Sequence, residues 1–380
     1  MLKDNERIDF SGVFSEIDFE NHLEEIKQAT RWVTVPVKSM RFRKLDESDM
    51  FATPSDSEKD TATEGTGLFV KGEHLPCVGI RECAIPSIRR RLGLNCQAMD
   101  TVTITTAASI MSDVAKESPG QATTLVGIVD GKVNAMLSTD AGKNSYQVFD
   151  SADVFEASKD MVDEMVAAES TEPTEFVAQW GYDGFVARWK TPIRQELMGW
   201  KYKTIVDMET SDIGESSVKY GASLEVGGTR VPFMTEQRIE HRRKNSGLDV
   251  LEASEMVKAS VTELGRNIPD AMKEGMSRLR MLEMITIANP IETMDAMSCL
   301  VGLPKRSYVP VIRKYSIIHG NKPTTALQLY LELSAVLDVY ENRQRNFTNQ
   351  NIVKGNLLKL LGADWARHDH YSADVRDRYR

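Results

Sequence analysis

The sequence predicts an α+β fold, in which an antiparallel sheet built from hairpins is followed by a C-terminal helical region. Three observations support this prediction. In the first two thirds of the chain, short β-type runs are joined by tight turns that contain glycine. These runs do not alternate regularly with helices, as the strands of a parallel sheet would. After His241 the apolar residues recur with helical spacing.

The pattern divides the chain into five segments. They are an N-terminal helix and strand (1–45), an acidic flexible loop (46–67), an α+β sheet domain (68–245), a helical region packed on the sheet (246–345) and a charged C-terminal segment (346–380).

The first segments show a helix, an edge strand and an acidic insertion. Apolar residues with helical spacing predict a helix over 12–29, and residues 31–44 read as a strand in which Pro36 favours an edge position. The window 46–64 holds seven acidic residues against Lys59, a net charge of −6. Because the whole chain carries −9, the remainder carries only about −3, so its acidity does not exclude a polyanionic partner.

The sheet domain begins with a helix and continues as hairpins. Residues 79–94 are expected to end in a short amphipathic helix, with Pro86 in its first turn and Gly93 at its close. A further helix is expected over 151–168. The expected strands are 123–129 and 132–137 around Asp130-Gly131, 176–180 and 185–189 around 181–184, 202–208, 217–226, and 229–233 after Gly227-Gly228.

The C-terminal region reads as four helices. Asn289-Pro290 and Pro304 supply the breaks between them. The expected helices are 248–264, 269–287, 291–303 and 324–343.

Composition is that of a soluble globular protein, with 380 residues, 41% hydrophobic and 27% charged. No apolar run approaches the ~18 residues of a membrane span, and the first six residues lack the apolar core of a signal peptide. We therefore expect a cytoplasmic protein with no membrane partner, whose four cysteines stay reduced.

Searches for catalytic motifs find none. GxxxxGK[ST], HExxH, GxSxG and GxGxxG are all missing, so the sequence predicts no catalytic residue and no cofactor. Two weak groups of metal ligands, His74 with Cys77 and Cys83, and His368 with His370 and two aspartates, lack a defined ligand spacing, and we predict no metal site.

The strongest functional signal is a basic and aromatic window, 180–203. It contains three of the five tryptophans, and five Lys/Arg against two acids give it a charge of +3. Flat rings beside cations suit unpaired bases and phosphates. The predicted nucleic-acid-binding residues are Trp180, Tyr182, Arg188, Trp189, Lys190, Trp200, Lys201, Lys203, Arg242 and Arg243.

The alternative for this window is an ordinary half-buried hairpin. Strand alternation would place Phe185, Ala187 and Trp189 on one face and Arg188 and Lys190 on the other. Nucleic-acid binding requires that rings and cations share one exposed face, so the structure can distinguish the two interpretations.

Two further basic clusters have the same two interpretations, phosphate contact or solvated surface. Arg89-Arg90-Arg91 ends the predicted helix, where cations also suit the helix dipole. The other cluster runs from Arg238 to Lys244 and includes Arg242 and Arg243.

The order of several short motifs resembles the phage- and plasmid-encoded family known as domain of unknown function 932. The motifs are Arg91-Leu92-Gly93-Leu94, Ala135-Met136-Leu137-Ser138, residues 210–214 with Ser217, His241-Arg242-Arg243, and Thr325-Ala326-Leu327 to Tyr330. The chain departs from the family pattern at Thr139-Asp140-Ala141 and in the acidic insertion after Lys44. The resemblance implies a mobile-element setting and no particular reaction.

We therefore predict a phage or plasmid accessory protein that binds single-stranded nucleic acid in replication or recombination. Strand annealing is one specific form of this function and would favour a homo-oligomer. The alternative is a structural or host-interaction protein of a phage with no nucleic-acid activity, which the acidic window suits better. An enzyme with a site assembled from distant residues ranks last.

Overall fold

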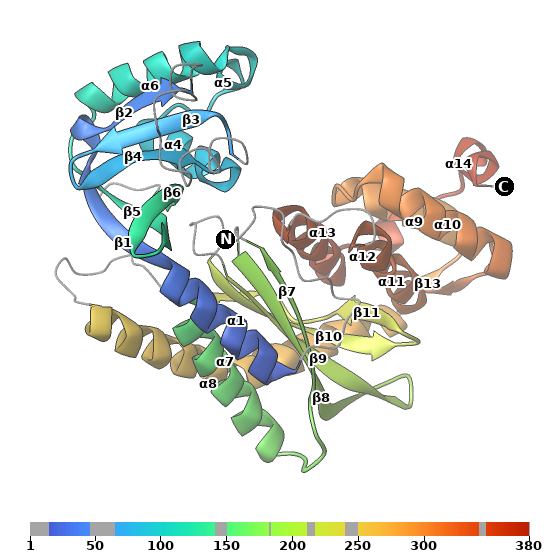
Figure 1. Cartoon of the computed structure of the whole chain (residues 1–380). Coiled ribbons are helices and arrows are strands. Elements are labelled where there is room, and N and C mark those ends of the chain that lie inside the picture. The colour runs from blue at the N-terminus through green and yellow to red at the C-terminus, as the bar shows by residue number, and fades with distance from the viewer. Residues whose placement is uncertain are drawn as a thin grey trace.

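A computed structural model describes residues 15–45, 65–140, 150–181, 184–210, 217–239, 250–341 and 347–379. Two mainly antiparallel sheets are followed by a helical C-terminal region, which confirms the predicted α+β class. Figure 1 shows the first sheet and its helices at one end of the molecule, the C-terminal helices at the other, and the second sheet between them.

The first sheet has six strands in the order β1-β5-β6-β4-β3-β2. Every neighbouring pair is antiparallel except β4 and β6. Strand β1 lies at an edge of the sheet, as Pro36 predicted, but the single strand expected over 31–44 is two strands, because a 3-10 turn at Val37–Ser39 separates β1 from β2 at the opposite edge. Asp130-Gly131 forms the predicted turn with φ of 50° and 73°. The strands are β1 (Thr30–Pro36), β2 (Arg41–Lys44), β3 (Leu68–Gly72), β4 (Leu75–Ile80), β5 (Gln121–Val129) and β6 (Lys132–Thr139).

Helices α4 (Ile85–Leu92), α5 (Ala98–Thr101) and α6 (Ile104–Glu117) close one side of this sheet around a core of their own. Helix α4 begins with Pro86 in its first turn and ends at Gly93, whose φ is 70°, as the sequence predicts. Helices α5 and α6 were not predicted from the sequence.

The second sheet runs β11-β10-β9-β8-β7, and β12 pairs with β10. Its strands are β7 (Glu175–Gly181), β8 (Gly184–Leu197), β9 (Trp200–Thr210), β10 (Val218–Val226), β11 (Thr229–Pro232) and β12 (Gln237–Ile239). Helices α1 (Glu16–Ala29) and α7 (Ser151–Ala167) pack on one face of it, and α8 (Val250–Glu283) packs along α7.

Helix α8 corrects the prediction of two helices over 248–264 and 269–287. It continues through Pro269, although a proline inside a helix removes one backbone hydrogen bond. The reason is tertiary packing, because one buried stripe runs unbroken past the proline. The stripe comprises Val257, Val261, Ile268, Met272, Met276 and Leu279.

The C-terminal region differs from the prediction in three further places. The helix expected over 324–343 is two helices that meet at Ala335, and α10 was not expected at all. The charged segment 346–380, for which no helix was expected, forms α13 and α14. The elements are β13 (Thr286–Ile287), α9 (Pro290–Leu300), α10 (Lys305–His319), β14 (Thr324–Thr325), α11 (Ala326–Ser334), α12 (Val336–Glu341), α13 (Phe347–Lys359) and α14 (Ala373–Arg378).

The charged C-terminal segment is docked on α9. Two acidic side chains of α9, Glu292 and Asp295, are buried and receive their partners from this segment. Arg376 lies 2.9 Å from Glu292, and the hydroxyl of Tyr379 donates to Asp295. Asp369 accepts hydrogen bonds from the backbone N–H groups of Ala288 and Asn289, at 2.7 Å each.

Candidate nucleic-acid interface

The predicted window forms most of a long hairpin, β8 with β9, whose two halves differ. The inner half is flanked by β7, which pairs with β8 up to Lys190, and by β10, which pairs with β9 from Thr204 onward. Residues 194–203 extend past both neighbours as a two-stranded ribbon (Figure 1). Met198 and Gly199 turn the chain at its tip with φ of 53° and 76°, the values of the tight turn that suits a twisted hairpin.

Trp200 follows this turn and its side chain is 70% exposed, and the neighbouring Met198 is also exposed. Strand alternation places Trp200 and Tyr202 on the ribbon face of their partners Leu197 and Gln195. The opposite face carries Lys201 and Lys203, paired with Glu196 and Arg194. The rings and the cations of the tip therefore lie on opposite faces. The shared exposed face expected of a nucleic-acid interface is not present on the ribbon, and a nucleic-acid strand would have to pass around the turn to reach both.

Carboxylates neutralise most cations of the window. Lys190 lies 2.8 Å from Glu225 and 3.5 Å from Glu175, and its hydrogen bond with Glu225 raises the pKa of Lys190. Glu175 also accepts a hydrogen bond from Lys203 at 3.0 Å, which lowers the pKa of Glu175.

Three cations of the window remain, and one of them, Arg188, pairs with Asp207 in the inner half of the hairpin. Arg194 is 3.7 Å from Glu172. Within the part of the chain that the structure describes, Lys201 is exposed and has no ion-pair partner.

Trp189 corrects the prediction that it stacks a base. Its ring is fully buried, 5.8 Å from the ring of Phe155 and stacked on it at 19°, and 5.7 Å from that of Phe176. Its indole N–H donates to Glu16 of α1 at 2.7 Å. The cause is the alternation anticipated for a half-buried hairpin, which turns Phe185, Ala187 and Trp189 toward α1 and α7.

Two of the other predicted residues that the structure describes, Arg188 and Trp180, lie away from the ribbon. Arg188 is buried on the second face of the sheet. Trp180 lies on β7 opposite Phe185, where its backbone alone is described. Tyr182, Arg242 and Arg243 lie outside the described residues. Trp200, Lys201 and Lys203 are thus the predicted residues that the structure brings together at the exposed tip.

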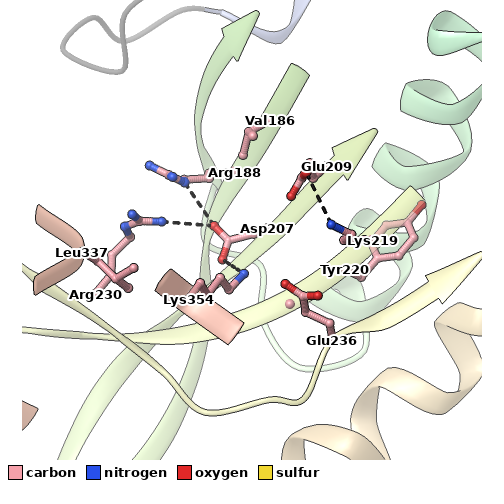
Figure 2. A pocket seen from close by; sticks show the side chains of 11 residues that line it. Val186, Arg188, Asp207, Glu209, Lys219, Tyr220, Arg230, Glu236, Leu337 and Lys354 are labelled. Atoms are coloured by element: carbon pink, nitrogen blue, oxygen red, sulfur yellow. Dashed lines mark hydrogen bonds and ion pairs between the residues drawn. The ribbon is translucent and has the colours of Figure 1, made fainter. Parts of the chain in front are cut away.

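A charged pocket occupies the face of the second sheet opposite α1 and α7, and Asp207 of β9 lies at its centre (Figure 2). Lys354 of α13 contacts its carboxylate at 2.9 Å, Arg188 of β8 at 3.1 Å and Arg230 of β11 at 3.6 Å. Four elements therefore meet at one carboxylate. A Cβ on Gly221 would collide with the ammonium group of Lys354, so the glycine leaves room for this lysine to reach Asp207.

The electrostatics of Asp207 favour its charged form. Burial alone would raise its pKa, but the positive charges of Lys354, Arg188 and Arg230 outweigh burial and lower the pKa to about 2. Glu209 and Lys219, 3.7 Å apart, and Glu236 complete the charged lining. Such a site can hold a polar or anionic group, and it also ties α13 to the sheet.

Sequence reasoning missed Asp207, Arg230 and Lys354. Asp207 and Lys354 stand 147 positions apart, and no motif joins them. The only sequence signal for this pocket was the predicted alternation of β8, which places the side chains of Arg188 and Trp189 on opposite faces of the sheet.

The basic cluster at the end of α4 has structural partners. In the basic end of α4, Arg89 pairs with Asp100, and Arg91, 3.6 Å from Asp140, is buried with it. Across the described residues, no three His, Cys, Asp or Glu side chains are grouped to hold a metal ion. No helix within those same residues is long and apolar enough to cross a membrane.

Comparison of the chain with protein-family models, curated proteins and solved structures finds no match in any of the three. The resemblance to the phage and plasmid family therefore stays a prediction.

Proposed function

We propose that this protein binds single-stranded nucleic acid at the tip of the β8–β9 hairpin, as a phage or plasmid accessory protein of replication or recombination. The observation that carries the proposal is the exposed ring of Trp200 on a ribbon that extends beyond the sheet. The genetic setting comes from the family resemblance. Strand annealing, with a homo-oligomer that would carry it out, is the specific form we propose.

The ribbon suits a single strand better than a duplex. An exposed indole can stack only on a base that is already unpaired, and such a stack contributes about 1–3 kcal/mol. Because the ribbon is two strands wide and open at its turn, a nucleic-acid strand can cross its end with a base on Trp200. Its adjoining phosphates then lie toward Lys201 and Lys203 on the other face.

The test measures fluorescence anisotropy of a labelled single-stranded oligonucleotide at several salt concentrations. We expect binding at low salt that weakens as salt rises, because cations on the protein displace counterions from the phosphates. Trp200→Ala should weaken binding about 5- to 150-fold through loss of stacking. Lys201→Gln should weaken binding less, and it should reduce the slope of log affinity against log salt concentration by about one, the value for one lost phosphate contact.

Ile317→Ala is the matched control, because Ile317 is an exposed apolar residue (83%) on α10, in the C-terminal helical region. It should bind like the wild type. Failure of the wild type to bind at low salt would overturn the proposal, as would unchanged affinity in Trp200→Ala.

A further inference from the structure

Charge is divided unevenly between the helices at the two sides of the molecule. Helix α10 contains two lysines, two arginines and no acidic residue, a charge of +4. Helices α1 and α7 each contain five acidic residues against one lysine, a charge of −4 each. Figure 1 shows α10 among the C-terminal helices, away from α1 and α7. The basic helix of one molecule can therefore meet the acidic helices only of another molecule.

The exposed face of α10 combines cations with apolar side chains. Arg313 and Lys314 are both exposed, and neither forms an ion pair or a hydrogen bond with any residue that the structure describes. Ile317 and Ile318 follow one helical turn later, on the same side of the helix, and are 83% and 59% exposed. Such a face suits a partner surface that is both acidic and apolar.

A groove between α7 and α8 has both properties. Its volume is about 440 Å³, within the range of about 300–1,000 Å³ that is typical of binding pockets. Met161 and Met165 supply its apolar floor. Gly265 of α8 leaves room for this floor, because a Cβ there would lie 2.6 Å from the Cγ atom of Met161. Asp160 and Glu164 are exposed on the α7 wall, and in the described parts of the chain neither forms an ion pair.

The α8 wall of this groove carries cations. Lys258 is paired with Glu156 at 2.7 Å. Arg266 is exposed and, as far as the described ranges extend, has no ion-pair partner. A basic helix that enters the groove is therefore attracted to the α7 wall and repelled by Arg266, which determines the side of the groove on which it lies.

We infer that α10 of one copy of this chain docks in the α7–α8 groove of a second copy. Its two isoleucines contact the methionine floor, and its two cations face the carboxylates of α7, as when an amphipathic helix binds in a groove. Because the two surfaces differ, the contact is head-to-tail, and its repetition forms a ring or an open chain. The inference rests on the homo-oligomer of the proposed function, for which it names the contact, and it does not require nucleic acid.

The experiment is sedimentation velocity of the full chain without nucleic acid, at several chain and salt concentrations. We expect the sedimentation coefficient to rise with chain concentration at low salt and to fall as salt rises, because salt screens exposed charges. Arg313→Glu with Lys314→Glu should raise the dissociation constant at least tenfold, as should Asp160→Lys with Glu164→Lys. An equimolar mixture of these two variants should associate again, because each supplies the surface that complements the other.

The matched control is Lys71→Glu with Lys132→Glu, which makes the same change of net charge at exposed positions of the first sheet and should associate like the wild type. Arg266→Glu should tighten association severalfold, because it removes the repelling cation. Weaker association of Arg266→Glu would overturn the inference, as would a mixture of the two folded charge-reversed variants that stays monomeric.

The two proposals fail separately. The oligonucleotide test of the hairpin tip uses chain too dilute to associate, so Ile317→Ala remains its control. A wild type that stays monomeric in concentrated solution at low salt, but binds the oligonucleotide, would overturn this inference alone.

Discussion

The inner half of the β8–β9 hairpin and its tip contain the same residue types in opposite environments. In the inner half Trp189 is fully buried, whereas Trp200 at the tip is 70% exposed. Arg188 of the inner half is held on a buried carboxylate, whereas the side chain of Arg194 at the tip is 43% exposed beside a surface glutamate. Composition alone does not separate these two regions.

What separates them is the cover that the rest of the fold provides. Strands β7 and β10 flank the inner half, α1 and α7 cover one face of it, and Lys354 of α13 reaches the other. Among the strands that the structure describes, none pairs with the ribbon at 194–203 except its own partner. Helix α8 does contact the ribbon, since Arg280 donates to the backbone carbonyl of Glu196 at 3.2 Å and Leu197 is buried, so the exposed part is the turn from Met198 to Lys201. An aromatic and basic window therefore marks a candidate interface only where both strands and helices leave it exposed.

The largest expected effect is the loss of the Trp189 ring. Trp189→Ala removes a fully buried side chain from an aromatic cluster and should lower the free energy of unfolding by about 3–5 kcal/mol. Urea unfolding followed by circular dichroism measures it. A loss of unfolding free energy below 1 kcal/mol would show that Trp189 is not tightly packed in the inner half of the hairpin.

Removal of the charge of Asp207 should come next. Asp207→Asn keeps the shape of the side chain but leaves three buried cations without their carboxylate, at a cost of about 3 kcal/mol. The same unfolding measurement applies, with Glu172→Gln as the control, because its partner Arg194 forms an exposed ion pair that contributes little.

The pH dependence of stability gives a third comparison. The pKa of Asp207 in the folded protein, about 2, lies below the ordinary value of 3.8. The contribution of Asp207 to the free energy of unfolding is therefore complete above about pH 4 and is lost as pH falls through 2. The difference in unfolding free energy between wild type and Asp207→Asn should therefore shrink by roughly 2–3 kcal/mol over this window. If the difference in unfolding free energy between wild type and Asp207→Asn stays constant from pH 6 to pH 2.5, the lowered pKa of Asp207 is contradicted.

The smallest effect on stability is expected at the tip. Trp200→Ala should change the free energy of unfolding by less than about 0.5 kcal/mol, because the side chain is mostly exposed. Urea unfolding beside Trp189→Ala tests the contrast directly. A loss above 2 kcal/mol would mean that Trp200 is packed against another part of the protein and is not available to a base.

The sequence was informative where local chemistry decides the structure. Asp130-Gly131, Gly93 and the alternation of β8 all adopt the expected conformations, because turn residues and strand periodicity act over a few positions. It failed where distant packing decides, as at Pro269 inside α8. The candidate sites show the same division. Trp200 could be predicted from the local composition of its window, whereas the contact between Asp207 and Lys354 depends on the tertiary fold and could not be predicted.

The contact between Lys354 and Asp207 also orders events during folding. A ribosome adds roughly 5–20 residues per second, so roughly 7–30 s pass between synthesis of Asp207 and of Lys354, 147 positions later. Arg188 and Arg230 are synthesised close to Asp207, and the strands can pair while α13 is still unmade. The Asp207 face of the second sheet is therefore completed after its strands, by α13, which is synthesised later than the strands that it contacts.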